Sequence, residues 1–157
     1  MHFVNKSNDS VITIDKFVFS DCELLTSVTI PDSVTEISYG IFYNCKSLKS
    51  IIIPNSVEKI GESVFMNCKS LQTIIIPESV VEIGESAFWD CSSLSSVTIP
   101  KSVTKIRNGA FAGCTSLNSL NIPDNVIQIG ENAFQDIPHI EYHGTATGAP
   151  WGAKSMN

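Results

Sequence analysis

Apolar side chains recur along this chain at a constant 23-residue step. Three columns of the pattern hold a single residue type each: valine, isoleucine and phenylalanine. Their members are Val11, Val34, Val57, Val80, Val103 and Val126; Ile14, Ile37, Ile60, Ile83, Ile106 and Ile129; Phe19, Phe42, Phe65, Phe88, Phe111 and Phe134. A fixed period of this length is typical of a solenoid, in which each repeat forms one coil.

Inside each repeat, the segment L-x-x-V-x-I ends in alternating β-branched residues, as in Val97 and Ile99. This alternation predicts a strand that turns these two side chains towards a core. Proline follows and ends the strand, because proline has no N–H for a ladder. The next segment, S-V-x-x-I, is expected to be a short extended or turning stretch that sends two more aliphatic side chains inward.

The rest of the repeat, G-x-x-A-F-x-x-C, places Ala and Phe three and four residues before Cys, a spacing that favours one or two helical turns. The residue before each Cys position tolerates left-handed backbone and predicts a helix C-cap there. These residues are Asp21, Asn44, Asn67, Asp90, Gly113 and Asp136. The alternative, a metal-binding ladder of Asp residues, is weakened by the glycine and the two asparagines.

One repeat cannot enclose its own apolar side chains, so identical residues must stack from coil to coil. With strands ~4.8 Å apart, about six coils give a short rod or shallow arc on the order of 25 to 30 Å long. The predicted structural core includes Phe42, Phe65, Phe88, Phe111, Cys45, Cys68, Cys91 and Cys114.

The pattern predicts a partial coil or cap over 1–9, repeats over 10–137 and a C-terminal cap over 138–157. The first coil departs from the repeat, since it has Asn8 where proline is expected. Two later positions depart as well: Arg107 replaces the glycine of the Ile-Gly pair, and Ile137 replaces a sixth cysteine.

The full unit L-x-x-V-x-I-P-x-S-V-x-x-I-G-x-x-A-F-x-x-C resembles the BspA-like leucine-rich repeat, also called the treponemal-type repeat, which has the same period. The ending, with Tyr142, Gly144, Thr145 and Trp151, is similar to the family's usual cap, in which a tryptophan closes the core. The resemblance implies an α/β solenoid, a right-handed coil with a parallel sheet on the concave side and short helical or 3-10 turns on the convex side. Family members are mostly surface or secreted proteins associated with adhesion to host proteins or other cells.

Charge and composition argue against several classes of function. The 10 Lys and Arg residues are scattered among 16 Asp and Glu residues, so no basic face for nucleic acid is expected. No apolar run approaches the ~20 residues of a membrane helix, and membrane insertion is not expected. The N-terminal stretch lacks the apolar run of a signal peptide. The chain is therefore expected to be intracellular or a mature fragment; the resemblance favours a secreted or cell-surface location.

The cysteines share the 23-residue step: Cys22, Cys45, Cys68, Cys91 and Cys114. Zinc needs thiolates that converge tetrahedrally, whereas side chains on successive coils point in parallel, and there is no C-x-x-C pair. Disulfides between neighbouring coils are an alternative, but parallel side chains hold the Cβ atoms further apart than the ~3.8 Å that a disulfide prefers. A ladder of buried, reduced thiols is the favoured interpretation. No cofactor is predicted.

Histidine is scarce, and the repeats contain none. His139, Glu141 and His143 alternate in the predicted cap, so an extended strand would place them on one face, where they could bind a metal. Exposed cap residues are the favoured interpretation. Since there is also no phosphate-binding loop and no nucleophile elbow, no enzymatic activity is predicted.

Two columns of strand residues are expected to face solvent on the concave sheet. The predicted binding surface on it consists of Ile52, Ile75, Thr73, Ser50, Thr98, Lys49 and Gln72. Its adjacent isoleucines Ile52 and Ile75 are apolar groups that the fold does not require, although strand propensity alone would also favour them. A convex strip of Tyr43, Met66 and Trp89 is the alternative surface, and packing against neighbouring coils is its competing interpretation.

These observations predict a non-enzymatic module that binds a protein or cell-surface ligand, of unknown identity, through the concave sheet. One alternative is a structural spacer, a fragment of a longer repeat protein without its own ligand. The other is a metal-binding or enzymatic protein that uses the pair His139 and His143.

Overall fold

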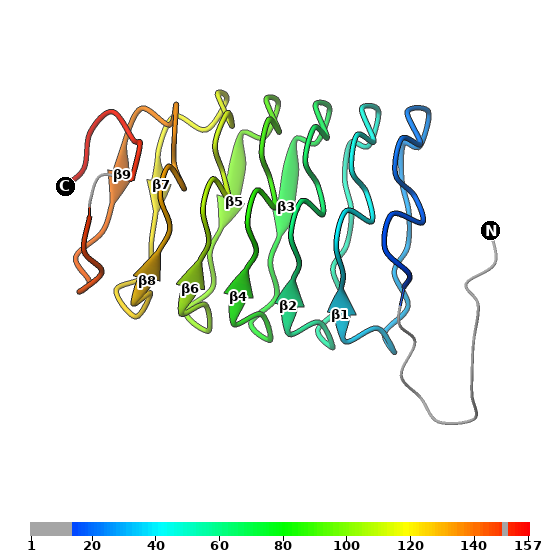
Figure 1. Ribbon diagram of the computed structural model, residues 1–157, viewed down its shortest axis with the longest axis horizontal. Helices are drawn as coiled ribbons and strands as arrows, with labels where there is room; N and C mark the ends of the chain where they lie inside the picture. The colour runs from blue at the N-terminus through cyan, green and yellow to red at the C-terminus, as the bar shows by residue number, and fades with distance from the viewer. Residues whose placement is uncertain (1–13, 149–150) are drawn as a thin grey trace.

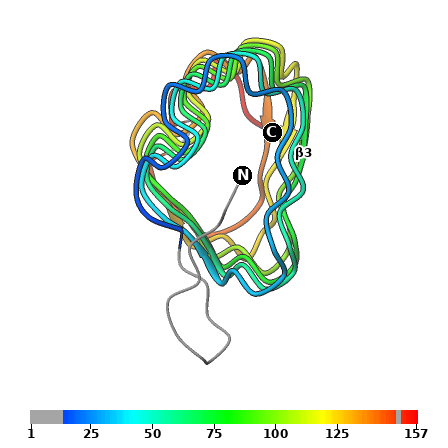
Figure 2. The same ribbon diagram turned by 90° about the vertical axis from the view of Figure 1, so that its right-hand side faces the viewer.

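The computed structural model describes residues 14–148 and 151–157. The chain winds into a parallel β-solenoid whose coils stack along one axis (Figure 1). Seen along that axis, the coils superimpose on one closed outline (Figure 2). The partial coil predicted over 1–9 lies outside the described residues.

One sheet runs through five coils, and each of its strands contains two residues. Its strands are β1 (Glu36–Ile37), β2 (Lys59–Ile60), β4 (Glu82–Ile83), β6 (Lys105–Ile106) and β8 (Gln128–Ile129), hydrogen-bonded in that order. Every pair is parallel and joins equivalent residues of successive repeats, so isoleucine lies beside isoleucine. The segment S-V-x-x-I after each proline, which the sequence predicts only as a short extended or turning stretch, thus forms a sheet of its own.

The predicted strands before the prolines, together with one strand of the C-terminal cap, form the other ladder, which we call the strand face. Here β3 (Thr73–Ile75) pairs with β5 (Ser96–Thr98), and β7 (Leu120–Asn121) pairs with β9 (Ile140–Glu141), all in parallel. Single bridges extend it across the earlier coils, from Thr29 to Ile52 and from Ile52 to Ile75. The ladder is interrupted between β5 and β7, which belong to different sheets.

The helical or 3-10 turns predicted on the opposite side are not confirmed. In residues 14–148 and 151–157 there is no helix, and these segments form hydrogen-bonded turns. The predicted left-handed residue before each Cys position is confirmed, with φ between 56° and 73°. A second left-handed position lies four residues earlier, and a helix cannot hold it because its residues are all right-handed. This second column contains Phe17, Gly40, Ser63, Ser86, Gly109 and Asn132.

Backbone groups of these turns bond to the next coil instead of within a helix. The N–H of Phe42 donates to the carbonyl of Val64 at 2.9 Å, and the N–H of Phe65 donates to that of Ala87 at 2.8 Å. The same bond recurs in later coils. The turns therefore stack with the regularity of a sheet although they contain no strand.

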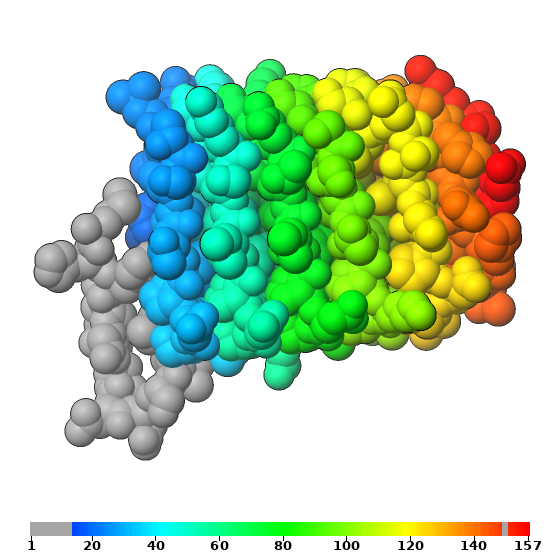
Figure 3. Space-filling view, turned by 180° about the vertical axis from the view of Figure 1, so that it is seen from behind, coloured from blue at the N-terminus to red at the C-terminus, as the bar shows by residue number. Residues whose placement is uncertain are grey.

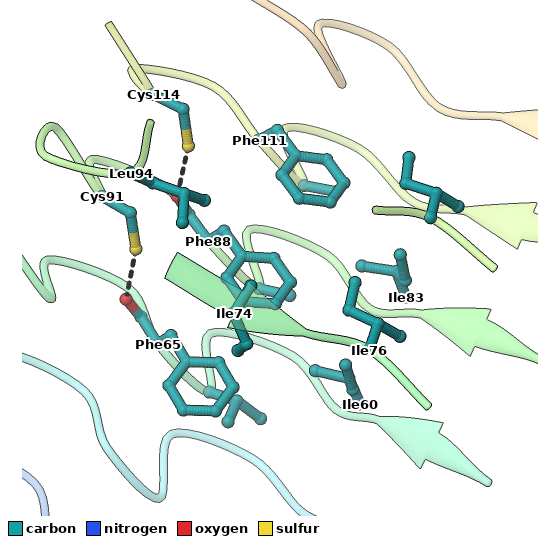
Figure 4. Packing of buried hydrophobic residues seen from close by; sticks show 14 of the residues in the cluster. Ile60, Phe65, Ile74, Ile76, Ile83, Phe88, Cys91, Leu94, Phe111 and Cys114 are labelled. Carbon is teal, nitrogen blue, oxygen red and sulfur yellow. Dashed lines mark hydrogen bonds between the residues drawn. The ribbon is translucent and has the colours of Figure 1, made fainter. Parts of the chain in front are cut away.

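The core lies inside this outline and is filled by columns of identical side chains. Successive phenylalanine rings from Phe19 to Phe134 stack with interplanar angles of 18° or less. Figure 4 shows this stack beside the isoleucine columns that line the two sheets. The phenylalanine side chains from Phe42 onwards are fully buried.

The C-terminal segment covers the last coil. Trp151 is 5% exposed and packs edge-on against Phe134 and Tyr142, at centroid distances of 6.4 and 5.5 Å. The tail then returns beside β9, where Ile140 and Met156 form a parallel bridge. Aromatic rings and tail backbone thus close the apolar core at this end.

Successive coils approach closely at the glycine of the Ile-Gly pair. A Cβ atom added to Gly84 would lie 2.5 Å from the carbonyl carbon of Gly61, and one added to Gly61 would lie 2.7 Å from the Ile37 oxygen. These neighbours are backbone atoms and cannot rotate away. At Arg107, which occupies the same column, the backbone N–H donates to the Ile83 carbonyl at 3.0 Å. The equivalent hydrogen bonds from the glycines are 2.8 Å long.

We expect Gly84→Ala to lower the free energy of unfolding by about 1–3 kcal/mol, the usual cost of overpacking. Urea denaturation of the purified chain measures this loss. Arg107→Ala is the matched control, because this position already carries a Cβ atom; losing its partly buried ion pair with Glu82 should cost about 1 kcal/mol or less. Equal stability of the Gly84→Ala variant and the wild type would show that the coils can separate freely here.

Candidate functional site

The strand face exposes an aliphatic pair in the middle of the rod. Ile52 and Ile75 are each 80% exposed, while their chain neighbours Ile51, Ile74 and Ile76 are 6% exposed or less. The bridge between Ile52 and Ile75 places the two side by side on adjacent coils. Strand alternation thus separates a buried column of isoleucines from an exposed pair.

Polar residues surround this pair. All seven residues of the predicted binding surface are exposed. Ser50 and Thr73 lie two residues before Ile52 and Ile75, and Thr73 and Ile75 pair in register with Ser96 and Thr98. Lys49 and Gln72 directly precede Ser50 and Thr73 in the chain, and the backbone N–H of Gln72 donates to the carbonyl of Lys49 at 3.1 Å. Figure 3 views the rod from the side on which β3 lies in Figure 2, with the coils as parallel ridges.

A hollow of about 600 Å³ lies on the same side, where the ladder is interrupted between β5 and β7. Its lining includes Val97, Thr98 and Ile99 from one coil and Asn121 and Pro123 from the next. Sequence reasoning missed it. The only hint was asparagine at position 121, since asparagine is depleted in strands.

The alternative strip of Tyr43, Met66 and Trp89 is half-buried. Trp89 packs on the next coil: a Cβ atom added to Gly109 would lie 2.7 Å from its ring. Packing between coils therefore accounts for a tryptophan at position 89 and for a glycine at position 109. The strand face is therefore the better candidate for binding.

The cysteines form a ladder of hydrogen-bonded thiols inside the core. Each Sγ donates to the carbonyl of the phenylalanine 26 residues earlier, at 3.1–3.2 Å, from Cys45, Cys68, Cys91 and Cys114. Figure 4 shows two of these bonds. All five cysteines are free, and Cys22 is partly exposed.

Burial disfavours the thiolate form of these cysteines. It raises the pKa of Cys45 to about 12 and that of Cys114 to about 12, and it also raises the pKa of Cys68 and Cys91. Nucleophilic catalysis needs a thiolate. These four thiols therefore serve the core and are not candidates for chemistry.

The C-terminal histidines do not converge on one point. His139 Nδ1 lies 2.9 Å from Ser155 Oγ, whereas His143 Nε2 lies 3.8 Å from Glu141 Oε1. Across residues 14–148 and 151–157, no three His, Cys, Asp or Glu side chains are placed to hold a metal ion. The same part of the chain contains no helix that is long and apolar enough to span a bilayer.

The sequence matches the model of the BspA type leucine rich repeat region in six copies, over residues 12–141. The chain belongs to the BspA-type leucine-rich repeat family. Leucine-rich repeats are a general protein-interaction fold, and this family and fold are typically non-enzymatic. No curated protein matches the chain.

Solved structures of bacterial leucine-rich repeat proteins share the fold. A T. pallidum leucine-rich repeat protein is 31% identical with a TM-score of 0.70, over 74% of this chain and 58% of the other. A leucine-rich cell surface protein from Faecalibacterium prausnitzii is 37% identical with a TM-score of 0.57, over 76% and 39%. A Bacteroides ovatus leucine-rich repeat protein is 26% identical with a TM-score of 0.58, over 82% and 46%. The chain thus spans between about two fifths and three fifths of these structures.

The raised thiol pKa values predict that stability falls in alkali. Unfolded thiols ionise from about pH 9, whereas the folded thiols stay protonated, so the unfolded state binds fewer protons above pH 9. The free energy of unfolding should fall between pH 9 and pH 12 by up to about 1.4 kcal/mol per pH unit for each buried thiol. Urea denaturation at pH 8, 9 and 10 measures the slope.

Cys91→Val is the control for this slope, because it keeps an apolar side chain and removes one titrating group. Between pH 9 and pH 10 the variant should lose less stability than the wild type. An identical slope in both proteins would contradict the prediction.

Proposed function

We propose that this chain is a non-enzymatic protein-binding module whose strand face, centred on Ile52 and Ile75, engages a protein or cell-surface ligand. The observation that carries the proposal is the pair itself, 80% exposed on adjacent coils. The same column contains Thr29, Thr98 and Asn121 in other coils, so the fold does not require an aliphatic residue there.

The energetics of burial support this surface. Covering an isoleucine side chain is worth about 1.5–3 kcal/mol, so two adjacent side chains can supply the apolar centre of an interface. The flanking hydroxyl groups of Ser50 and Thr73 and the cation of Lys49 fit a polar rim. The strand ladder holds all of them on a rigid support, which limits the entropy lost on binding.

We further propose that the chain acts at the cell surface, in adhesion. The structure from Faecalibacterium prausnitzii, which is 37% identical, is described as a cell surface protein, and this description supports the proposal. The net charge of -6 also agrees with a protein ligand better than with nucleic acid.

A structural spacer is the second candidate, because the chain matches only part of each related structure. In that role the coils would set the distance between other domains and bind no ligand. The two candidates differ in one measurable property: a spacer has no surface residue whose substitution changes binding.

We expect Ile52→Asp with Ile75→Asp to weaken binding at least tenfold, since the double substitution replaces an apolar contact with two charges that an interface must desolvate. Binding is measured with fluorescently labelled chain on whole cells and on immobilised surface proteins. Circular dichroism and urea denaturation of the variant check that its fold is intact.

Val81→Asp with Ile127→Asp is the matched control. These aliphatic residues are 49% and 63% exposed, share another column and lie off the strand face. This variant should bind like the wild type. Wild-type binding by a folded Ile52 and Ile75 variant would place the binding surface elsewhere; no binding by any of the proteins would favour the spacer.

A further inference from the structure

The two coils on either side of the interrupted ladder are less closely joined than the others. All residues of β5 and β7 are described, and the two strands do not pair, although β5 pairs with β3 and β7 with β9. The phenylalanine rings that follow this junction, Phe111 and Phe134, are 6.2 Å apart, compared with 5.0–5.5 Å in the preceding coils.

The sequence explains the loose junction. Ile137 stands at the cysteine position of the later coil, so the Phe111 carbonyl receives no thiol hydrogen bond of the kind that joins Cys114 to Phe88 at 3.2 Å. Asn121 stands in a strand column where the earlier coils contain Thr or Ile, residues that favour strands. Two coil-to-coil interactions are thus weakened at one place.

An apolar surface becomes accessible as a result. Val97 is only partly buried, whereas the residues at the same repeat position in the adjoining coils, Ile74 and Leu120, are 3% and 2% exposed. Val97 and Pro123 line the hollow of about 600 Å³ from its two sides. The hollow therefore offers apolar walls next to the exposed column of the strand face.

The rim of the hollow carries charges directly after the prolines. Glu78, Lys101 and Asp124 are exposed and line it, one from each of three successive coils. Among the described residues none of these three forms an ion pair. The rim thus offers two carboxylates and one ammonium group, a net charge of -1.

Apolar walls below an acidic rim suit a basic side chain. Lysine and arginine bury their methylene stems along apolar surface while the cation stays at the edge, where a carboxylate can accept its hydrogen bonds. We propose that this hollow receives a lysine or arginine side chain of a protein partner bound on the strand face. The inference rests on the proposed function, because the partner is the one that covers Ile52 and Ile75.

The distance between the two features defines the partner further. The hollow lies about two strand spacings from the isoleucine pair, ~10 Å. This is about the span of three residues in a polyproline II segment, which has three residues per turn and so keeps side chains three positions apart on one face. The partner segment therefore carries an aliphatic residue and a basic residue about three positions apart. The aliphatic side chain contacts Ile52 and Ile75, and the basic one enters between Thr98 and Asn121.

Synthetic peptide pools test this assignment. Each pool contains end-capped nine-residue peptides with leucine fixed at position three, one of Arg, Lys, Leu, Glu or Ser fixed at position six, and mixed Ser, Thr and Val elsewhere. Amide resonances of the ¹⁵N-labelled full chain are followed during titration. The Arg and Lys pools should shift the resonances of Val97 and Asn121 at concentrations at least fivefold lower than the other pools.

Charge variants identify the rim as the source of that preference. Glu78→Gln with Asp124→Asn should weaken binding of the Arg pool at least fivefold, and Lys101→Met should strengthen it, because Lys101 competes for the same carboxylates. Glu62→Gln with Glu131→Gln removes two exposed charges elsewhere and should leave binding unchanged.

A preference for the Leu or Glu pool, an Arg pool unaffected by the rim variant, or no shift with any pool would overturn the assignment. The proposed function is judged separately, by the Ile52 and Ile75 variant on cells and surface proteins. If that variant loses binding while the Arg pool shows no preference, the strand face remains the binding surface and only the basic side chain is wrong.

Discussion

The structure depends on one constraint: every coil must lie in register on the next, because no coil can bury its own core. Phenylalanine stacks on phenylalanine, isoleucine pairs with isoleucine, and the turn backbone donates across the junction, as from Phe42 to Val64. All of these contacts require that successive repeats keep the same length. The glycine column shows how closely the register is held, since Gly84 leaves no room for a methyl group.

This constraint explains which parts of the fold the sequence could predict. The period and the alternation of strand residues together assign inward and outward columns, and they place Phe88 and Cys91 in the core and Ile52 and Ile75 outside it. The predicted helical turns are not confirmed, because contacts between coils set the backbone of these turns. Ala and Phe spacing fits a helix, but Ser63 and Ser86 adopt left-handed backbone, which serine does not signal. The stability of that backbone comes from the neighbouring coil, which a local pattern does not describe.

The candidate site divides in the same way. The exposed isoleucine pair follows from strand alternation, whereas the hollow exists because a ladder fails to form between β5 and β7. A failure of pairing depends on small differences between consecutive repeats, here Asn121 and Ile137. The positions that all repeats share predict the fold. The features of the surface that are particular to this protein lie where one coil departs from the consensus.

The turn-side hydrogen bonds give the solenoid a chemical direction. Each of them runs from an N–H of one coil to a carbonyl of the following coil, from Phe19 to Ile41 at one end and from Phe134 to Trp151 at the other. On the turn side, the two ends of any stack of these coils are therefore unlike: one presents carbonyl acceptors and the other N–H donors. Coils can be added only head to tail, and an inserted coil of one full repeat forms two junctions with the same hydrogen-bond pattern as the one junction it replaces. The fold can thus lengthen in whole repeats while its cap stays the same.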